Sequence, residues 1–192
     1  MPLLIKILGI KVVGTAISLI VFLTKTGPGF TPITLVLHED SVIFQSSLRK
    51  AFTKGLDEII MSGTEVGIFY TCTFLERDQE GYITPVYEKT TYRHLVYDPA
   101  LDSFQLVTDK VYHIAGTDLD RAKQEISTIT AVIVPAVDIV ADHKYMLKIV
   151  AALNTIEIEA IEAENFDLNV FWNFKYPSTQ TKWISGENIG SL

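Results

Sequence analysis

The chain has 192 residues, with 16 basic and 23 acidic side chains that are unevenly distributed. Residues 1–25 contain three lysines and no acid, so the rest of the chain carries a net charge of −10. A domain this acidic, without a basic stripe, is repelled by nucleic-acid phosphates and by anionic lipid headgroups, so we expect no nucleic-acid binding. Cys72 is the only cysteine, which excludes an intramolecular disulfide and a cysteine-based zinc site.

The N-terminal segment from Leu3 to Leu23 is apolar except for Lys6, Lys11 and a few small residues. Its uninterrupted part, Val12 to Leu23, spans only ~18 Å as a helix, less than the ~30 Å hydrocarbon core of a bilayer. The whole segment is long enough if the two lysines extend to the interface. No small-x-small cleavage site follows. This pattern predicts an uncleaved signal-anchor, with a cleaved signal peptide or a buried N-terminal helix as alternatives.

Orientation follows from the two lysines, because they precede the apolar run. The positive-inside rule then places the N-terminus in the cytoplasm and the rest of the chain in the periplasm, anchored to the inner membrane. If the segment is cleaved, the domain is secreted. We expect residues 1–25 to form the anchor, 26–32 a linker, 33–185 one domain and 186–192 a tail.

The domain is predicted to be α+β, mainly an antiparallel sheet or sandwich with two amphipathic helices. Two short β-prone runs, 33–37 and 42–44, flank a polar turn and predict a hairpin. The helical spacing of apolar residues predicts the first helix from Leu48 to Met61, capped by Ser46 or Ser47 and ended by Gly63.

Three runs predict an antiparallel meander: 65–75, 82–97 and 103–108. In the first run, alternate residues from Val66 to Phe74 face one way. Pro85 marks an edge or a bulge near the start of the second run.

The remaining elements are a helix capped by Thr117, a strand from Tyr145 to Asn154 and a last strand from Leu168 to Phe174. Residues 131–140 are either a strand or a buried irregular segment. The acidic stretch 157–167 has no glycine for a calcium loop, so it is read as a solvated face.

No catalytic signature is present, and none of the four histidines stands at metal-ligand spacing from another. We therefore expect no enzyme, no cofactor and no metal. Aromatic residues are plentiful, and some are expected on a partner surface. The candidates for that surface are Tyr82, Tyr87, Tyr92, Trp172 and Trp183.

The order of several segments resembles a known bacterial family. Ser62-Gly63 is followed by a hydrophobic strand that ends in Arg77, then by an Arg93-x-x-x-Tyr97-Asp98 pattern, and then by Phe104-Gln105-Leu106. This progression is similar to the family called domain of unknown function 4390, over roughly residues 33–185. The resemblance implies an exported or membrane-anchored envelope protein with a β-rich fold and no assigned activity. The chain departs from the pattern near Pro135 and in the acidic stretch.

These features predict a non-catalytic interaction or assembly module of an envelope complex, with other envelope proteins as partners. The main alternative is a module that binds a lipid, peptide or glycan in a groove between the sheet and the helix 48–61. An enzyme of unfamiliar type is the third possibility, and a deep pocket that collects His94 or His113 with acids would favour it.

Overall fold

The computed structural model describes residues 27–38, 41–135, 138–157 and 165–189. The predicted anchor lies outside these residues, as do the first residue of the predicted linker and the last residues of the predicted tail. Within the described ranges, no helix is both long enough and apolar enough to cross a membrane. The elements described begin at Gly29 and end at Ile189, beyond the predicted domain limits on both sides, because a short strand and a short helix occupy those flanks.

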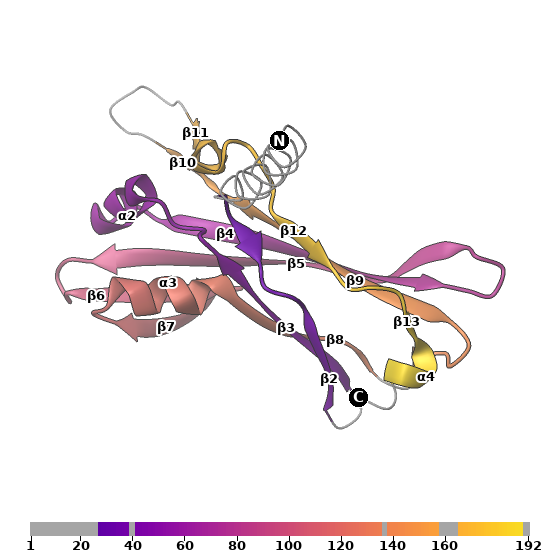
Figure 1. Ribbon diagram of the computed structural model, residues 1–192. Coiled ribbons are helices and arrows are strands. Elements are labelled where there is room, and N and C mark those ends of the chain that lie inside the picture. Colours follow the sequence, from indigo (N-terminus) through magenta and orange to yellow (C-terminus); the bar gives the residue numbers. More distant parts are fainter. Residues whose placement is uncertain (1–26, 39–40, 136–137, 158–164, 190–192) are drawn as a thin grey trace, which may run out of the picture.

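The larger of the two main sheets is antiparallel and has seven strands, and it forms the back of the molecule in Figure 1. Its order is β12-β9-β4-β5-β6-β7, with β13 also paired to β9. The strands are β4 (Val66–Arg77), β5 (Ile83–Asp98), β6 (Ser103–Thr108), β7 (Val111–Gly116), β9 (Lys144–Leu153), β12 (Ser178–Gln180) and β13 (Ile184–Ser185). The predicted meander and the predicted strand from Tyr145 are confirmed, and the pairing of β4 with β5 shifts register near Pro85, as expected.

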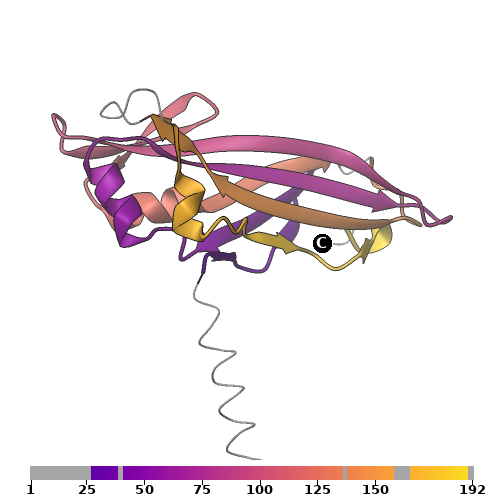
Figure 2. The same ribbon diagram turned by 90° about the horizontal axis from the view of Figure 1, so that it is seen from above.

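The second sheet centres on β3, which pairs with β1 and β2 on one side and β8 on the other. Its strands are β1 (Gly29–Phe30), β2 (Thr34–His38), β3 (Ser41–Arg49) and β8 (Thr128–Pro135). A small pair, β10 (Thr155–Glu157) and β11 (Asn165–Asp167), stands apart from both sheets. Figures 1 and 2 show the second sheet lying against one face of the larger one. The open question about residues 131–140 is settled for 131–135, which continue β8.

The core is continuous between the two sheets. Alternate residues of β4, from Val66 to Phe74, are buried on the inner face, as predicted. From β3, the side chains of Val42, Phe44 and Leu48 are buried against them. Cys72 is part of this core, and burial raises the pKa of its thiol to about 11, so it is an apolar packing residue rather than a reactive one.

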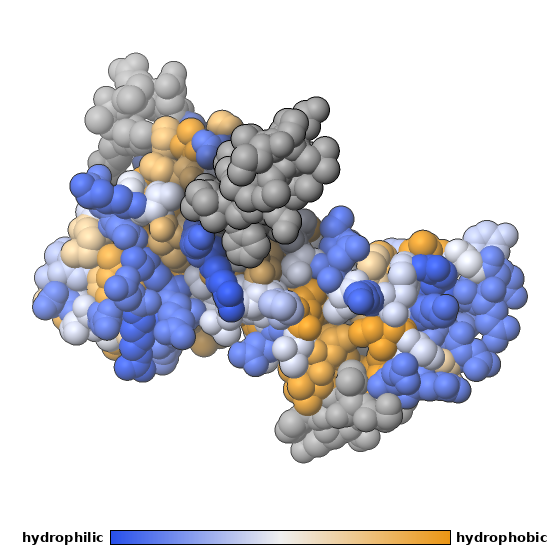
Figure 3. Space-filling model, in the orientation of Figure 1, coloured by the Kyte–Doolittle hydropathy of each residue, from blue (hydrophilic) through white to orange (hydrophobic). Residues whose placement is uncertain are grey.

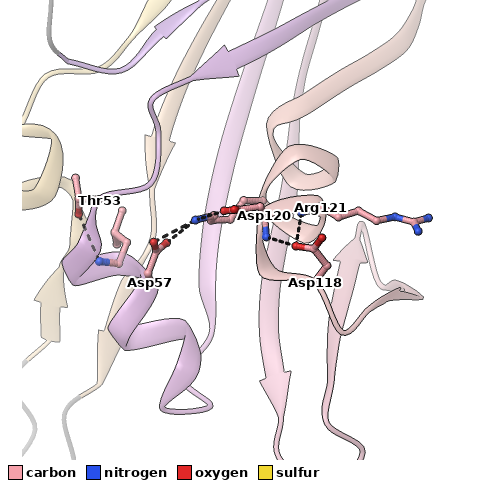
Figure 4. Close-up of polar contacts among 7 residues, drawn as sticks. Thr53, Asp57, Asp118, Asp120 and Arg121 are labelled. Atoms are coloured by element: carbon pink, nitrogen blue, oxygen red, sulfur yellow. Dashed lines mark hydrogen bonds and ion pairs between the residues drawn. The ribbon is translucent and has the colours of Figure 1, made fainter.

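The first predicted helix was placed too early. The chain stays extended through Arg49 because β3 pairs with β8 as far as Ser47 and with β1 as far as Arg49. Helix α2 (Lys54–Met61) begins only after Thr53, whose hydroxyl accepts a hydrogen bond from the amide of Leu56 (Figure 4). The predicted helix included Leu48 and Ala51 among its apolar residues. Leu48 instead belongs to β3, and Ala51 lies in the connection between β3 and α2.

Helix α3 (Leu119–Ser127) was predicted, but its cap is Asp118 rather than Thr117. The Asp118 carboxylate accepts hydrogen bonds from the amides of Asp120 and Arg121. The two helices are joined by Lys123, whose ammonium lies 3.1 Å from a carboxylate oxygen of Asp57 and 2.9 Å from Asp120 (Figure 4). This bridge fixes α3 against α2 at one end of the molecule.

Two elements differ from prediction near the C-terminus and in the meander. The predicted last strand is instead a 3-10 helix, η2 (Leu168–Trp172), capped by Asp167. Strand β7 was not predicted. A short helix, α4 (Gly186–Ile189), ends the described chain, and its Ile189 is buried.

A polar cluster at the start of β9 holds the C-terminal segment in place. Glu76 Oε1 accepts a hydrogen bond of 2.6 Å from the Tyr145 hydroxyl and lies 2.9 Å from His143 Nδ1. The carbonyl of His143 in turn accepts a hydrogen bond from the amide of Gly186, at the start of α4. The Tyr145 hydrogen bond, followed by His143, lowers the pKa of Glu76 below its ordinary value of 4.5.

This cluster predicts an acid-dependent loss of stability. A carboxyl whose pKa is lower in the folded than in the unfolded state stabilises the fold above its unfolded pKa, and this contribution disappears as the pH falls through the folded value. We expect Glu76→Gln to lower the free energy of unfolding at pH 7 and the difference from the wild type to shrink steadily below about pH 4.5. Urea denaturation across a pH series measures this. A difference that is constant across the series would contradict it.

Candidate interaction surface

Strand β7 is the terminal strand of the larger sheet and pairs only with β6 among the described residues. Its sequence, Val-Tyr-His-Ile-Ala-Gly, contains no acid, lysine, arginine or proline. Three of its apolar side chains are strongly exposed: Val111 at 70%, Tyr112 at 74% and Ile114 at 65%. Edge strands normally carry charges or prolines that prevent pairing with other chains, and β7 has neither of these protections.

The turn before β7 determines which main-chain groups face outward. Asp109 and Lys110 form a two-residue connection between β6 and β7, and both have positive φ, of 46° and 75°. Such turns close on a hydrogen-bonded pair, here Thr108 with Val111, and hydrogen-bonded and non-hydrogen-bonded pairs then alternate. The amides and carbonyls of Tyr112 and Ile114 consequently point away from β6, in the direction from which another strand can approach.

A row of side chains connects this edge to the middle of the sheet, on the face opposite the core. The register places Gly67, His94, Val107 and Tyr112 side by side on four successive strands. Tyr92 stacks on Phe69 with ring centroids 4.4 Å apart and lies 5.2 Å from the His94 ring. We call Phe69, Tyr92, His94, Val107 and Tyr112 the outer-face strip.

The carboxylate of Glu65 lies beside the strip and organises it. Glu65 Oε1 accepts a hydrogen bond of 2.5 Å from the Tyr92 hydroxyl and lies 3.5 Å from His94 Nδ1. Burial, followed by this carboxylate, raises the pKa of Tyr92 well above its ordinary value, so the phenol stays protonated and continues to donate. The strip is therefore a fixed, largely apolar row of side chains that runs from Phe69, past the buried Val107, to the exposed edge β7.

Gly67 makes room for this arrangement, because a Cβ at that position would overlap the Tyr92 ring. We expect Gly67→Ala to displace the ring, break its bond to Glu65 and destabilise the fold by about 1–3 kcal/mol. Urea denaturation measures the loss, and Gly29→Ala is the matched control because nothing lies within 4 Å of that position. In a Tyr92→Ala background the cost of Gly67→Ala should disappear. If Gly67→Ala still destabilises the fold in the Tyr92→Ala background, the clash with the Tyr92 ring is not the cause of its cost.

The five residues predicted to form a partner surface are not brought together. Tyr82 is 73% exposed, at the turn between β4 and β5, whereas Tyr87 packs partly against the core. Tyr92 alone belongs to the outer-face strip. Trp183 lies under the guanidinium of Arg77, whose central carbon is 4.0 Å from the ring centroid.

The prediction for Trp172 is wrong. Its side chain is only 1% exposed, and its indole N–H donates a hydrogen bond of 2.7 Å to the carbonyl of Ala51. Because η2 replaces the predicted strand, this ring turns into the core rather than outward. Composition alone missed Tyr112 and Ile114, and the uncharged run from Val111 to Gly116 was the one sequence signal that could have found them.

A cavity of about 460 Å³ lies between β6, β7 and α3 and contains one of the histidines considered for catalysis. His113 Nε2 is 3.5 Å from Glu125 Oε2, a pair that can exchange a proton with a ligand. Arg93 lines the same cavity, but its Nε donates to Thr108 Oγ1 and its guanidinium donates to the carbonyl of Thr128. The Thr128 hydroxyl donates to the carbonyl of Gln124. These polar groups hold the end of α3 against β5 and β8.

The groove predicted beside the helix 48–61 takes a different form. Leu56 and Ile60 of α2 are fully buried. A cavity of about 400 Å³ lies instead between residues 47–52 and α3, next to Lys123. Among the described side chains, no group of three or more His, Cys, Asp or Glu residues is placed to hold a metal ion.

Comparison with known proteins adds no relative. No family model matches the chain, and neither a curated protein nor a solved structure shows significant similarity to it.

Proposed function

We propose that this chain is a membrane-anchored protein of the cell envelope, with its β-rich domain in the periplasm, and that it acts as a non-catalytic interaction module. In this proposal, β7 is the docking edge, and an extended strand of a partner envelope protein adds to it. The apolar segment 3–23 supports the anchor, and the resemblance to exported or anchored proteins agrees with it.

The observation that carries the proposal is the exposed edge formed by Tyr112 and Ile114. Strand addition uses outward main-chain amides and carbonyls for affinity and alternate side chains for specificity, and β7 offers both. The partner is expected to be another protein rather than a second copy of this chain, since two domains of net charge −10 repel each other.

Site-specific photo-crosslinking in native membranes tests this proposal. In one variant of the full chain a photoreactive amino acid replaces Tyr112. In a second variant of the same chain it replaces Tyr82, which is equally exposed and serves as the control. We expect one discrete adduct from position 112, crosslinked within an extended, apolar segment of the partner. An adduct of twice the mass of the chain would indicate self-association instead, and adducts of equal yield from both positions would contradict the proposal.

A further inference from the structure

A second apolar surface lies away from β7, in a groove of about 380 Å³ between β2 and the connection from β12 to β13. Ile33 and Leu35 line it on one side and Ile184 on the other, together with Gln180, Thr181 and Lys182. The three apolar side chains are half-buried and pack against the core, so the groove opens directly onto it. Figure 3 shows the corresponding hydrophobic surface between β2 and β13.

The charge in this groove is opposite to that of the domain as a whole. Among the described residues that line it, Lys182 is the only charged one, and none of them carries a carboxylate. The Lys182 side chain is exposed, with no hydrogen bond or ion pair to another described residue. An apolar groove with one ammonium beside it matches a molecule that has a hydrocarbon part and an anionic group.

The position of the groove relative to the N-terminal segment identifies the source of such a molecule. Leu23 is joined to Gly27 by four peptide steps, which span at most ~14 Å. Strand β1 follows at Gly29 and lies beside β12, whose Gln180 lines the groove (Figure 1). If the segment 3–23 is anchored in a bilayer, the face of the domain that carries β1, β12 and the groove is therefore held close to the lipid headgroups.

We infer that this groove binds an acyl chain of a membrane phospholipid, with the Lys182 ammonium near the headgroup phosphate. This inference rests on the proposed membrane anchor but not on strand pairing at β7. The bound lipid would orient the domain on the membrane and leave the outer-face strip and β7 free for the partner.

The test uses the full chain in vesicles of phosphatidylethanolamine and phosphatidylglycerol that contain a phosphatidylethanolamine with a diazirine near the end of one acyl chain. After illumination, we expect lipid adducts on residues 33–35 and 180–184. Leu35→Glu, which places a charge in the groove, should reduce these adducts at least fivefold. Val36→Glu is the matched control, because the neighbouring side chain points to the other face of β2 and is 48% exposed, and it should leave the yield unchanged.

Lys182→Glu is a second variant for the case in which Leu35→Glu does not fold, because residue 182 is exposed and tolerates substitution. It should lower the yield of lipid adducts in the groove at least twofold. Adducts that are absent from the groove, or equal in all variants, would overturn the inference. In a second experiment, a photoreactive amino acid placed at position 182 that crosslinks to residues 1–26 of the same chain would show that the N-terminal segment occupies the groove, and it would also overturn the inference. Flotation distinguishes the failures: a chain that does not float with the vesicles contradicts the anchor, whereas one that floats without groove adducts contradicts the lipid site alone.

Discussion

Ile114→Lys is expected to lower capture of the partner at position 112 at least tenfold while leaving the domain folded. The Ile114 side chain is 65% exposed and its main-chain groups face away from β6. Natural edge strands often carry a lysine that prevents pairing, because a partner strand would have to accommodate the charge of the lysine. A lysine at position 114 should act in the same way. Central residues of an interface commonly contribute about 2 kcal/mol or more, which corresponds to a change of more than tenfold in affinity.

The matched control is Ile83→Lys, which makes the same substitution at an apolar residue of similar exposure. Ile83 stands ten residues before Arg93 on β5, about 33 Å along the strand from where β5 begins to pair with β6. Neither variant removes a buried contact, so both should unfold within about 0.5 kcal/mol of the wild type. Equal loss of capture in the two variants would show that added positive charge, rather than the edge, is responsible.

Where the sequence predicted the fold well, burial alone determined the structure. Strand β4 alternates Ile68, Tyr70 and Cys72 toward the core, and only an extended chain can bury that set on one face. The same reasoning placed β9. These strands lie in the middle of the larger sheet, where both neighbours and the core enforce the pattern.

The docking edge could not be predicted in this way. The first four residues of strand β7 are all exposed, so burial imposes no alternation on them, and apolar Val111, Tyr112 and Ile114 fall on both faces of the strand. Its turn also lacks the usual signal, since Asp109-Lys110 occupies the two positive-φ positions where Asn-Gly or Asp-Gly is typical. The exposure of β7 makes it available to a partner, and the same exposure is the reason that its sequence lacks the alternation of a buried strand.

The error at residues 168–174 has a specific physical cause. The apolar residues alternate as they would in a strand: Leu168, Val170 and Trp172. At the end of β9, however, the main-chain groups of Leu153 form hydrogen bonds with the Asn169 side chain, and not with the backbone of a neighbouring strand. Its amide oxygen accepts from the amide of Leu153 and its amide nitrogen donates to the carbonyl of Leu153, each over 2.9 Å. The pattern of apolar residues cannot reveal a side chain that takes the place of a hydrogen-bonded neighbouring strand.

Trp172 is consequently the residue whose removal should cost the most stability. Trp172→Ala deletes a fully buried ring that packs in the core and bonds to the connection before α2, and we expect a loss of about 3–5 kcal/mol. That is a large share of the roughly 5–15 kcal/mol that stabilises a typical domain. Urea denaturation followed by circular dichroism measures it without relying on tryptophan fluorescence.

Two further variants separate packing from hydrogen bonding at this site. Trp172→Phe keeps an aromatic ring but leaves the Ala51 carbonyl without its donor, at an expected cost of about 1–3 kcal/mol. Trp183→Ala removes the other tryptophan, which contacts Arg77 at the surface, and should cost only about 0.5–1 kcal/mol. If Trp172→Ala cost no more than Trp183→Ala, the burial of Trp172 in the core would be contradicted. The predicted order follows directly from the complete burial of the Trp172 ring and the partial exposure of Trp183.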